Sequence, residues 1–565
     1  MSNSELKIAY LREFDTSICD IRFTLTVKTK TGNTLEKDVT GFAKNFDTLA
    51  DLKKSIEENL VALSSNNAEV DRNENCENNE LCDLPRKTLI IKFLKIDKDY
   101  KDSIKIQDFI KLKEDKILQV CDQKYAIVTN APFIRVVKLP FSISTNFPVE
   151  PITFQAYNLD RKTSKFIWLK STDQNVWHKI AEGYRYNVTE EDLDHYLKFF
   201  CVPYNSHKVK GPVVEAISEY KVNNVPQLPE CPFEKRHSLT KEELKGNKIR
   251  VVTYNVLADR YVDFDQFDYT LRKFLGVHYR KKLIMKELEG YKADIICLQE
   301  VDDMQYKVFY KNQFKKRGYE SIFNRKGNCI PEGLVCAFKA NRFNLLETKQ
   351  LVMSGSLDRK QFKKILDLLN ANSDVKKEFL RQKTSLQTTI LQDLYTNNIA
   401  IVGNTHLFYH PDANHIRLLQ AFMATLHLGN LKDRVGKESN RHGRVGIIFC
   451  GDFNSDVSKS LYDFMVAGTI NPEHEDCTKI SPSGDALLHH KLRLISASGT
   501  PKYTNYTKDY KGCLDYIFVD ALKFSVIRQI PVPTAEELKQ YVGLPNEVYP
   551  SDHLSLVVEL DFKSR

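Results

Sequence analysis

The stretch VGIIFCGDFNSD, residues 445–456, is a near-continuous apolar run that ends in a cluster of polar residues. An apolar run without alternation is typical of a strand buried on both faces. The same pattern recurs in IRVVTYNVLA (249–258), ADIICLQEV (293–301), GLVCAFK (333–339), IAIVGNTHLF (399–408), CLDYIFVD (513–520) and HLSLVVEL (553–560). Helical segments near 270–290 and 414–429 separate some of these strands. The C-terminal part of the chain is therefore expected to be an α/β fold whose helices cover its sheets.

Polar side chains stand at the ends of these strands, where loops on an α/β scaffold carry functional sites. They are Asn255 in TYNVLADRY, Glu300 in ICLQEVD, Asn404 and His406 in GNTHLF, Asp452 and Asn454 in GDFNSD, Asp515 in CLDYIFVD, and Asp552 and His553 in PSDHLSL. Taken singly, each is ambiguous: a Glu after a strand can begin a helix, a lone His is often structural, and GDFNS can be a turn. Together they predict a catalytic site at the strand ends.

The residue types in this set point to a divalent metal. Carboxylate and amide oxygens without cysteine favour Mg²⁺, with Mn²⁺ as the alternative, over zinc. Carboxylates alone would repel a phosphate group, so a cation is needed to bridge them. Histidine can stabilise the negative charge that develops on a phosphoryl group during the reaction.

Length and composition narrow the class of protein. The chain has 565 residues, of which 42% are hydrophobic and 28% charged, as in ordinary soluble domains. This excludes a disordered chain, a collagen-like repeat and a coiled-coil rod. We find no run of about 18 apolar residues and expect no membrane-spanning helix. Residues 251–565 hold 44 Lys and Arg against 37 Asp and Glu, which is compatible with an anionic substrate and equally with solubility charge.

The cysteines and the N-terminus bear on the cellular compartment. None of the 12 cysteines forms a CxxC pair, which excludes a zinc ribbon and favours reduced, buried thiols. The N-terminal stretch has no apolar signal core and carries Glu5, Glu13 and Asp15. These acids argue against a mitochondrial presequence and by themselves favour the cytosol.

Upstream of the catalytic part, two smaller domains are expected. Residues 14–140 read as an α+β domain, with an Asn- and Glu-rich surface loop at 64–83. In residues 143–228, strand-like stretches recur every 8–12 residues, which indicates an antiparallel β-sandwich. Residues 229–247 contain three prolines and many charges and read as a linker, so the catalytic domain spans 248–565.

Two resemblances sharpen these expectations. The pattern of 143–228 resembles an immunoglobulin-like domain, with Trp168 and Cys201 in its core positions. The motifs TYN, LQE, NTH, GDFN, LDYIF and SDH, in this order, resemble the endonuclease/exonuclease/phosphatase superfamily, and their spelling is similar to its deadenylase-like branch. The second resemblance spans about 248–565 and implies a four-layer α/β sandwich.

The superfamily resemblance also implies roles for single residues. Glu300 would be the primary Mg²⁺ ligand, and Asp452 would orient and deprotonate the attacking water. Asn255 would help to hold the metal or the phosphate, Asn454 would contact either, and Asp552 would support a second metal position. His553 would bind the phosphoryl oxygens, oriented by Asp515, while His406 would contact the scissile phosphate and Asn404 would brace its loop.

Substrate recognition rests on fewer signals. Deadenylases grip an adenine between a Pro and an aromatic with an Asn nearby, which here implies Pro411, Tyr510 and Asn505. Tyr510 stands where the deadenylases have a Phe, and a surface loop aromatic is the alternative. Glu332 would contact a ribose hydroxyl. Arg417 would face the substrate phosphates or cap its helix.

The basic helical segment at 354–384 is an insertion that the resemblance implies lies near the site.

The expected enzyme is a Mg²⁺-dependent phosphodiesterase that releases AMP from 2′,5′-linked oligoadenylates and 3′,5′ poly(A). Its partner is this RNA or oligoadenylate substrate, it does not enter a membrane, and it is expected to be a monomer. A 2′-phosphatase acting on a dinucleotide phosphate and a catalytically silent RNA-binding adaptor are the alternatives. The resemblance implies the mitochondrial matrix, in conflict with the acidic N-terminus.

Overall fold

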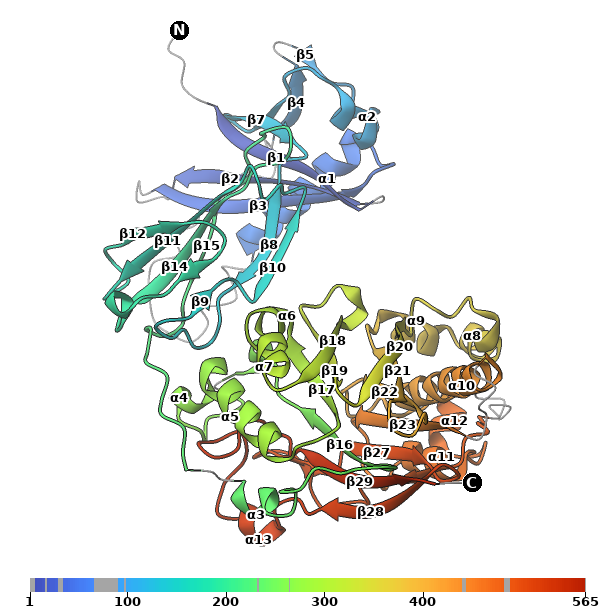
Figure 1. Ribbon diagram of the computed structural model, residues 1–565. Coiled ribbons are helices and arrows are strands. Elements are labelled where there is room, and N and C mark those ends of the chain that lie inside the picture. Colours follow the sequence, from blue (N-terminus) through green and yellow to red (C-terminus); the bar gives the residue numbers. More distant parts are fainter. Residues whose placement is uncertain are drawn as a thin grey trace, which may run out of the picture. The chain divides into compact units, whose positions relative to one another are not determined.

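The computed structural model describes residues 6–15, 18–28, 34–65, 90–95, 98–230, 233–263, 265–438, 444–481 and 488–563. The chain divides into two compact units (Figure 1). One comprises Met1–Leu139, Thr153–Tyr186 and Leu197–Ile217, and the other Pro140–Ile152, Asn187–Tyr196 and Ser218–Arg565. Most of the surface loop expected at 64–83 lies outside the described residues.

The first unit begins with a seven-stranded sheet of order β3-β2-β1-β7-β6-β4-β5. Its strands are β1 (Lys7–Asp15), β2 (Ile18–Lys28), β3 (Thr34–Lys44), β4 (Ile91–Lys95), β5 (Lys98–Asp99), β6 (Ile117–Val120) and β7 (Gln123–Thr129). The helices are α1 (Leu49–Ser65) and α2 (Ile106–Lys111). Leu49, Leu52, Ile56 and Leu60 lie on one stripe of α1 and are buried against the sheet.

The rest of the first unit is antiparallel. β8 (Phe133–Lys138) pairs with β10 (Thr153–Tyr157). A four-stranded sheet has the order β12-β11-β14-β15, formed by β11 (Lys165–Ser171), β12 (His178–Glu182), β14 (Tyr196–Val202) and β15 (Val214–Ile217). The segments Pro140–Ile152 and Asn187–Tyr196, which belong to the second unit, contain β9 (Pro148–Val149) and the 3₁₀ turn η1 (Glu190–Asp192), and β13 (Tyr186–Asn187) spans the boundary between the two assignments.

Two six-stranded sheets form the centre of the second unit. One has the order β18-β19-β17-β16-β29-β28 and the other β20-β21-β22-β23-β27-β24. The first contains β16 (Lys248–Asn255), β17 (Ile295–Asp302), β18 (Tyr319–Arg325), β19 (Glu332–Lys339), β28 (Phe524–Ile530) and β29 (Leu556–Phe562). The second contains β20 (Phe343–Val352), β21 (Ser385–Asp393), β22 (Ile399–His406), β23 (Val445–Asp452), β24 (Leu494–Ser496) and β27 (Asp515–Asp520).

The remaining elements of the second unit are helices, turns and one short hairpin. The helices are α3 (Glu234–His237), α4 (Arg272–Leu275), α5 (Val277–Gly290), α6 (Asp303–Gln305), α7 (Lys311–Lys316), α8 (Lys363–Ala371), α9 (Ser373–Arg381), α10 (Asn414–Glu438), α11 (Ser460–Ala467), α12 (Glu475–Ile480) and α13 (Ala535–Leu538). The 3₁₀ turns are η2 (Asp259–Tyr261), η4 (Lys326–Asn328) and η5 (Lys360–Phe362), and η3 (Tyr306–Tyr310) is a short π-helix. The hairpin is β25 (Asn505–Tyr506) with β26 (Lys511–Gly512).

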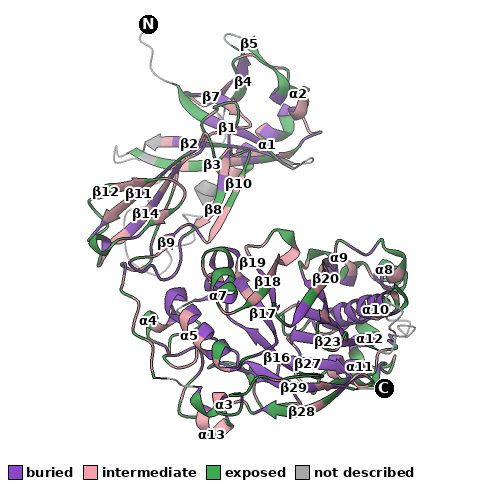
Figure 2. Cartoon of the chain, in the orientation of Figure 1, coloured by how far each residue is buried: buried purple, intermediate pink, exposed green. Residues whose placement is uncertain are grey.

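Three apolar cores stack these elements into four layers. The two sheets pack on each other through residues such as Val251 and Ile448. The first sheet packs on α5 and α7, with Leu288 as an example, and the second packs on α10, α11 and the inserted α8 and α9. Figure 2 shows the central strands β16, β17, β23, β27 and β29 and most of α10 in the colour of buried residues, whereas the edge strand β28 is mostly in the colour of exposed residues. The second unit is thus the expected α/β sandwich, because its strands need cover on both faces.

Within the described part of the chain, no helix is long and apolar enough to cross a bilayer. The cysteines in the described residues are all free thiols, and most are buried.

Candidate functional site

Strand register brings three of the expected site residues into one row. His406, the last residue of β22, lies beside Asp452, the last residue of the parallel strand β23. Asp452 in turn lies opposite Asp515, the first residue of the antiparallel strand β27. The row therefore follows from the strand pairing itself.

Asp452 is the residue on which the site converges. Its Oδ2 atom accepts a hydrogen bond from Asn255 Nδ2 at 2.9 Å, and the same amide group donates to Glu300 Oε1 at 3.0 Å. The Nε2 atoms of His406 and His553 each lie 3.6 Å from Asp452 Oδ2. Asn255 ends β16 in the first sheet and Asp452 ends β23 in the second, so the site is built across the two sheets.

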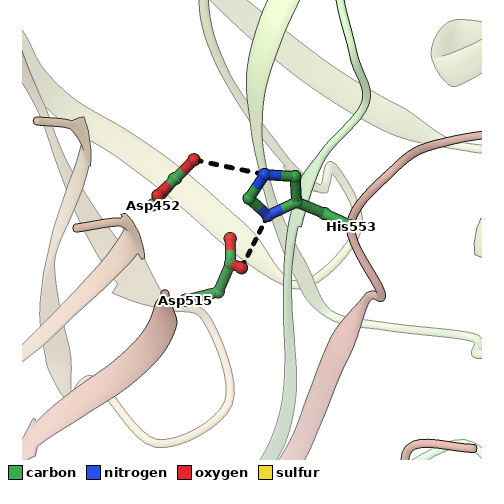
Figure 3. A group of neighbouring side chains, drawn as sticks. All are labelled: Asp452, Asp515 and His553. Carbon is green, nitrogen blue, oxygen red and sulfur yellow. Dashed lines mark hydrogen bonds and ion pairs between the residues drawn. The ribbon is translucent and has the colours of Figure 1, made fainter. Parts of the chain in front are cut away.

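His553 is held between two carboxylates, as Figure 3 shows. Its Nδ1 atom donates to Asp515 Oδ2 at 2.7 Å, which leaves Nε2 facing Asp452. Burial alone would lower the pKa of His553, but the charges of Asp515, Asp452 and Asp552 together raise it well above its ordinary value. The surrounding carboxylates therefore favour the protonated form of His553. Asp452, Asp515 and His553 also form a group whose ligand atoms lie within 4.8 Å of one another.

Glu300 occupies a bent part of β17. The strand pairing with β19 is irregular between Leu298 and Val301, and Glu300 itself has a φ of 56°. This bend turns the side chain out of the strand pattern, and Oε2 accepts from the backbone N–H of Ala258 at 3.0 Å. Burial, followed by the nearby charges of Asp552 and Glu332, raises the pKa of Glu300 to about 7.

His406 has the opposite electrostatic character to His553. Burial, with a smaller effect of the Lys326 charge, lowers the pKa of His406 to about 3. The ring is therefore neutral at physiological pH. Its Nδ1 atom is buried without a hydrogen-bond partner among the described residues, 3.8 Å from Glu300 Oε1.

The other two expected metal ligands, Asn454 and Asp552, lie beside the row of His406, Asp452 and Asp515, which we call the central row. The backbone N–H of Asn454 donates to Asp452 Oδ1 at 2.9 Å, and its side-chain Nδ2 donates to the carbonyl oxygen of Leu407 at 3.0 Å. Asp552 Oδ2 accepts from Asn505 Nδ2 at 3.3 Å. Asn505, one of the expected base-binding residues, thus lies beside the acidic cluster.

The chemistry of this donor set fits a divalent cation. Burial, followed by the charges of Asp552 and Glu332, raises the pKa of Glu300, and the charges of Asp515, Asp452 and Asp552 raise that of His553 against the effect of burial, so negative charge is concentrated in an enclosed space. The donors are carboxylate and amide oxygens, the ligands that hard divalent cations prefer. No cysteine belongs to the group, so a zinc-thiolate site does not fit.

Glu332 forms a second polar group at the start of β19. The side chain is buried, forms an ion pair with Lys326 at 3.0 Å and accepts a hydrogen bond from Tyr261 at 3.3 Å through Oε1. Its charge contributes to the raised pKa of Glu300, so this group adjoins the central row.

Asn404 is engaged inside the sandwich. It is fully buried, donates to the carbonyl oxygens of Leu298 and Val335, and accepts from Gln299 at 2.8 Å. These bonds tie β22 to β17 and β19 of the other sheet, below the residues of the central row.

Arg417, Pro411 and Tyr510 lie around the loop that follows β22. The Arg417 guanidinium donates to the carbonyl oxygens of Phe408, His410 and Pro411, so it closes this loop. Pro411 is exposed. Tyr510 is 44% exposed, and its pKa is raised by burial and by nearby acids such as Asp456.

Some supporting residues carry no signal that sequence reasoning used. Ser551 donates through Oγ to the carbonyl oxygen of Asn255 at 2.7 Å and accepts from the His553 N–H at 3.2 Å. Thr504 Oγ1 accepts from the backbone N–H of Asp515 at 3.0 Å. Ser551 is the first residue of the motif SDH, which is the one clue that its position offers; for Thr504 we see none.

Comparison with known proteins identifies similar chains. A sequence profile of the endonuclease/exonuclease/phosphatase family matches residues 252–374 and 382–553. The 2′,5′-phosphodiesterase 12 of Mus musculus is 32% identical over 480 residues, which cover 80% of this chain and 77% of that protein. The CCR4-Not complex 3′-5′-exoribonuclease subunit Ccr4 of Schizosaccharomyces pombe is 29% identical over 352 residues, or 56% of this chain and 50% of that protein.

A solved structure of ANGEL2, a 2′,3′-cyclic phosphatase, matches 57% of this chain and 98% of its own, with 23% identity and a TM-score of 0.47. All residues of the central row lie inside the segments that the family profile matches.

Proposed function

Because the chain belongs to the endonuclease/exonuclease/phosphatase family and is a hydrolase of phosphodiester bonds, we propose that it degrades adenosine-rich oligonucleotides and releases AMP. The proposed substrates are 2′,5′-linked oligoadenylates and 3′,5′-linked poly(A). The observation that carries the proposal is the buried row of His406, Asp452 and Asp515, closed by the 2.7 Å bond between Asp515 and His553.

Glu300, Asp452, Asn454 and Asp552 are the residues that would hold a divalent cation, and we assign Mg²⁺ to them. When bound, the cation neutralises phosphoryl charge and lowers the pKa of a coordinated water. The enclosed negative charge around Glu300 supports this assignment.

The chain's own side chains supply the remaining chemistry. Asp452 acts as the base for the attacking water, and its Oδ2 atom is oriented by the hydrogen bond from Asn255. Asp515 fixes His553 so that its Nε2–H faces the same space as Asp452, where it stabilises the negative charge that develops on the phosphoryl oxygens. His406 adds a neutral N–H donor, since burial keeps its ring uncharged.

Adenine recognition is proposed for the rim of the site. Tyr510 is half-exposed and offers a ring on which a base can stack, worth about 1–3 kcal/mol per base. Pro411 is exposed on the loop after β22, and Asn505 lies beside Asp552. We further propose that Glu332, with Lys326 and Tyr261 bound to it, receives a ribose hydroxyl.

For the N-terminal part, we propose an immunoglobulin-like β-sandwich over 143–228. The antiparallel sheet β12-β11-β14-β15 supports this, as does a core in which Trp168 packs edge-on against Phe199 near the buried Cys201. An experimental structure whose strands do not form two packed antiparallel sheets would contradict it.

The test of the proposed function is a timed digest of matched 2′,5′- and 3′,5′-linked oligoadenylates, with Mg²⁺ and with EDTA. We expect metal-dependent release of AMP, which the variant Asp452→Asn lowers by about 100-fold or more because it loses the base. Asp463→Asn is the control, since its carboxylate is exposed on α11 and belongs to none of the proposed site residues.

Other outcomes identify the alternatives. Release of inorganic phosphate from a dinucleotide phosphate, without AMP release from oligoadenylate, would favour a 2′-phosphatase. Binding of RNA by folded protein with no hydrolysis in Mg²⁺ would favour the adaptor.

A further inference from the structure

A solvent-open cavity of about 910 Å³ lies on the outer side of the second sheet of the catalytic unit. Its walls come from the edge strand β20, from η5 in the inserted segment, and from the middle of α10. Figure 1 labels β20 and α10. The residues that line it are Lys349, Gln350, Arg359, Lys360, Gln361, Leu426, His427, Asn430 and Leu431. None of these belongs to the site described above.

The lining is positively charged. Lys349, Arg359 and Lys360 line the cavity, and no acidic residue does. Lys349 is 2.5 Å from Glu347, which also pairs with Arg434. Arg359 and Lys360 are exposed and form no ion pair within the described ranges, so their charges are available to a ligand.

His427 lines the cavity as a buried side chain. His427 is 6% exposed, and its Nδ1 atom lies 3.3 Å from the amide nitrogen of Gln361. Asn430 donates to the Gln361 carbonyl oxygen at 2.8 Å, which orients that amide so that its nitrogen donates to Nδ1. The ring proton of His427 is therefore on Nε2, which has no hydrogen-bond partner among the described residues.

The electrostatics of His427 agree with this picture. Burial, followed by the charges of Arg359 and Lys349, lowers its pKa to about 4. The imidazole is thus a neutral donor in a field of positive charge, which favours an anion.

The strand pairing gives the separation between the cavity and the central row. Val352 at the end of β20 pairs with Ser385 of β21, and Leu386 pairs with Thr405, so β20 ends level with His406. Lys349 lies three residues before Val352, which is about 10 Å along β20 at the ordinary rise per residue. β20 lies two strand positions from β22, which is about 10 Å across the sheet. A few nucleotides of single-stranded nucleic acid can span this distance.

We propose that this basic cavity binds a backbone phosphate of the substrate strand, a few nucleotides away from the bond that is cut. Arg359, Lys360 and Lys349 provide the charge, and the side-chain amides of Gln361 and Asn430 in the lining provide polar contacts. The cavity thereby favours long oligonucleotides over dinucleotides. This inference rests on the proposed function of the central row.

The experiment compares kcat/KM for an adenylate dinucleotide and for an oligoadenylate of about twelve nucleotides, using the full chain. The double variant Arg359→Glu/Lys360→Glu should lower kcat/KM for the long substrate by about tenfold or more, because two phosphate contacts become repulsive. Its dinucleotide turnover should stay within about twofold of wild type, and the salt dependence of KM for the long substrate should weaken by a slope of about 1–2.

The matched control is Lys377→Glu/Arg381→Glu, which reverses two exposed charges on the neighbouring helix α9 outside the cavity. Equal losses on both substrates, no loss on the long one, or the same loss in the control would each overturn the inference. If wild type hydrolyses neither substrate in Mg²⁺, the proposed function fails instead, so the two failures are distinguishable.

Discussion

At the scale of single residues, the surroundings of Glu300 disfavour its charged form. Its side chain is 12% exposed and lies near the charges of Asp552 and Glu332, which help burial to raise its pKa from 4.5 to about 7. The folded protein thus binds a proton at Glu300 that the unfolded chain releases. The resulting stability is fully present below about pH 4.5 and is lost as the pH rises through about 7.

We therefore predict that Glu300→Gln stabilises the metal-free protein at pH 8, by up to about 3 kcal/mol, and makes little difference near pH 4.5. Thermal unfolding in EDTA at both pH values measures this, with the exposed Glu320→Gln as control. Mg²⁺ should raise the Tm of wild type at pH 8 more than that of Glu300→Gln, because the variant has lost a ligand. A variant less stable than wild type at pH 8 in EDTA would contradict the prediction.

At the scale of elements, the close pairing of β22 and β23 positions the central row. Gly451 precedes Asp452 with a φ of 143°, and a Cβ atom there would lie 2.0 Å from the carbonyl oxygen of Thr405. A side chain at this position forces the two parallel strands apart at the level of the site.

Gly451→Ala should accordingly lower the free energy of unfolding by about 1–3 kcal/mol and reduce kcat more than KM changes, since Asp452 is displaced. Urea unfolding and steady-state kinetics measure the two effects. The control is Gly429→Ala on α10, where the nearest atom to the new Cβ is at 3.7 Å. This change should stabilise the protein by about 0.5–1 kcal/mol through helix propensity; equal effects of both variants would refute the argument.

At the scale of the whole molecule, the segment before β16 is part of the catalytic unit rather than a free tether. Arg236 on α3 donates to Ser555 Oγ and to the Ser555 carbonyl oxygen, each at 2.8 Å, and to Glu287 at 3.2 Å. It thereby connects the start of the unit to α5 and to the segment that leads into the last strand, β29.

Arg236→Ala should cost about 3–5 kcal/mol of unfolding free energy, because it leaves the buried Glu287 carboxylate without its cation. The adjacent Lys235→Ala is the control: that side chain is 81% exposed, and its ion pair with Glu537 should be worth less than about 1 kcal/mol. Denaturant unfolding of the full chain distinguishes the two, and similar losses would show that Arg236 does not carry the connection.

The sequence by itself determined the strands of the catalytic unit and the residues at their ends. Unbroken apolar runs such as GIIFC must be buried on both faces, so they predict central strands, and the chain must turn polar where a strand leaves the core. For this reason Asn255, Glu300, His406 and Asp452 were predicted as a set from their shared place at strand ends, and the structure brings them together.

Only the tertiary structure decided which side chains touch, and with what charge. Asp515 and His553 are 38 residues apart, yet they form the 2.7 Å pair that favours the protonated form of His553, while burial keeps His406 neutral. Arg417 closes a loop through backbone carbonyls, and the basic cavity joins residues 349–361 to the distant residues 426–431 of α10. Local pattern carries none of this, because side-chain direction and desolvation depend on what packs across from each residue, which the chain settles only on folding.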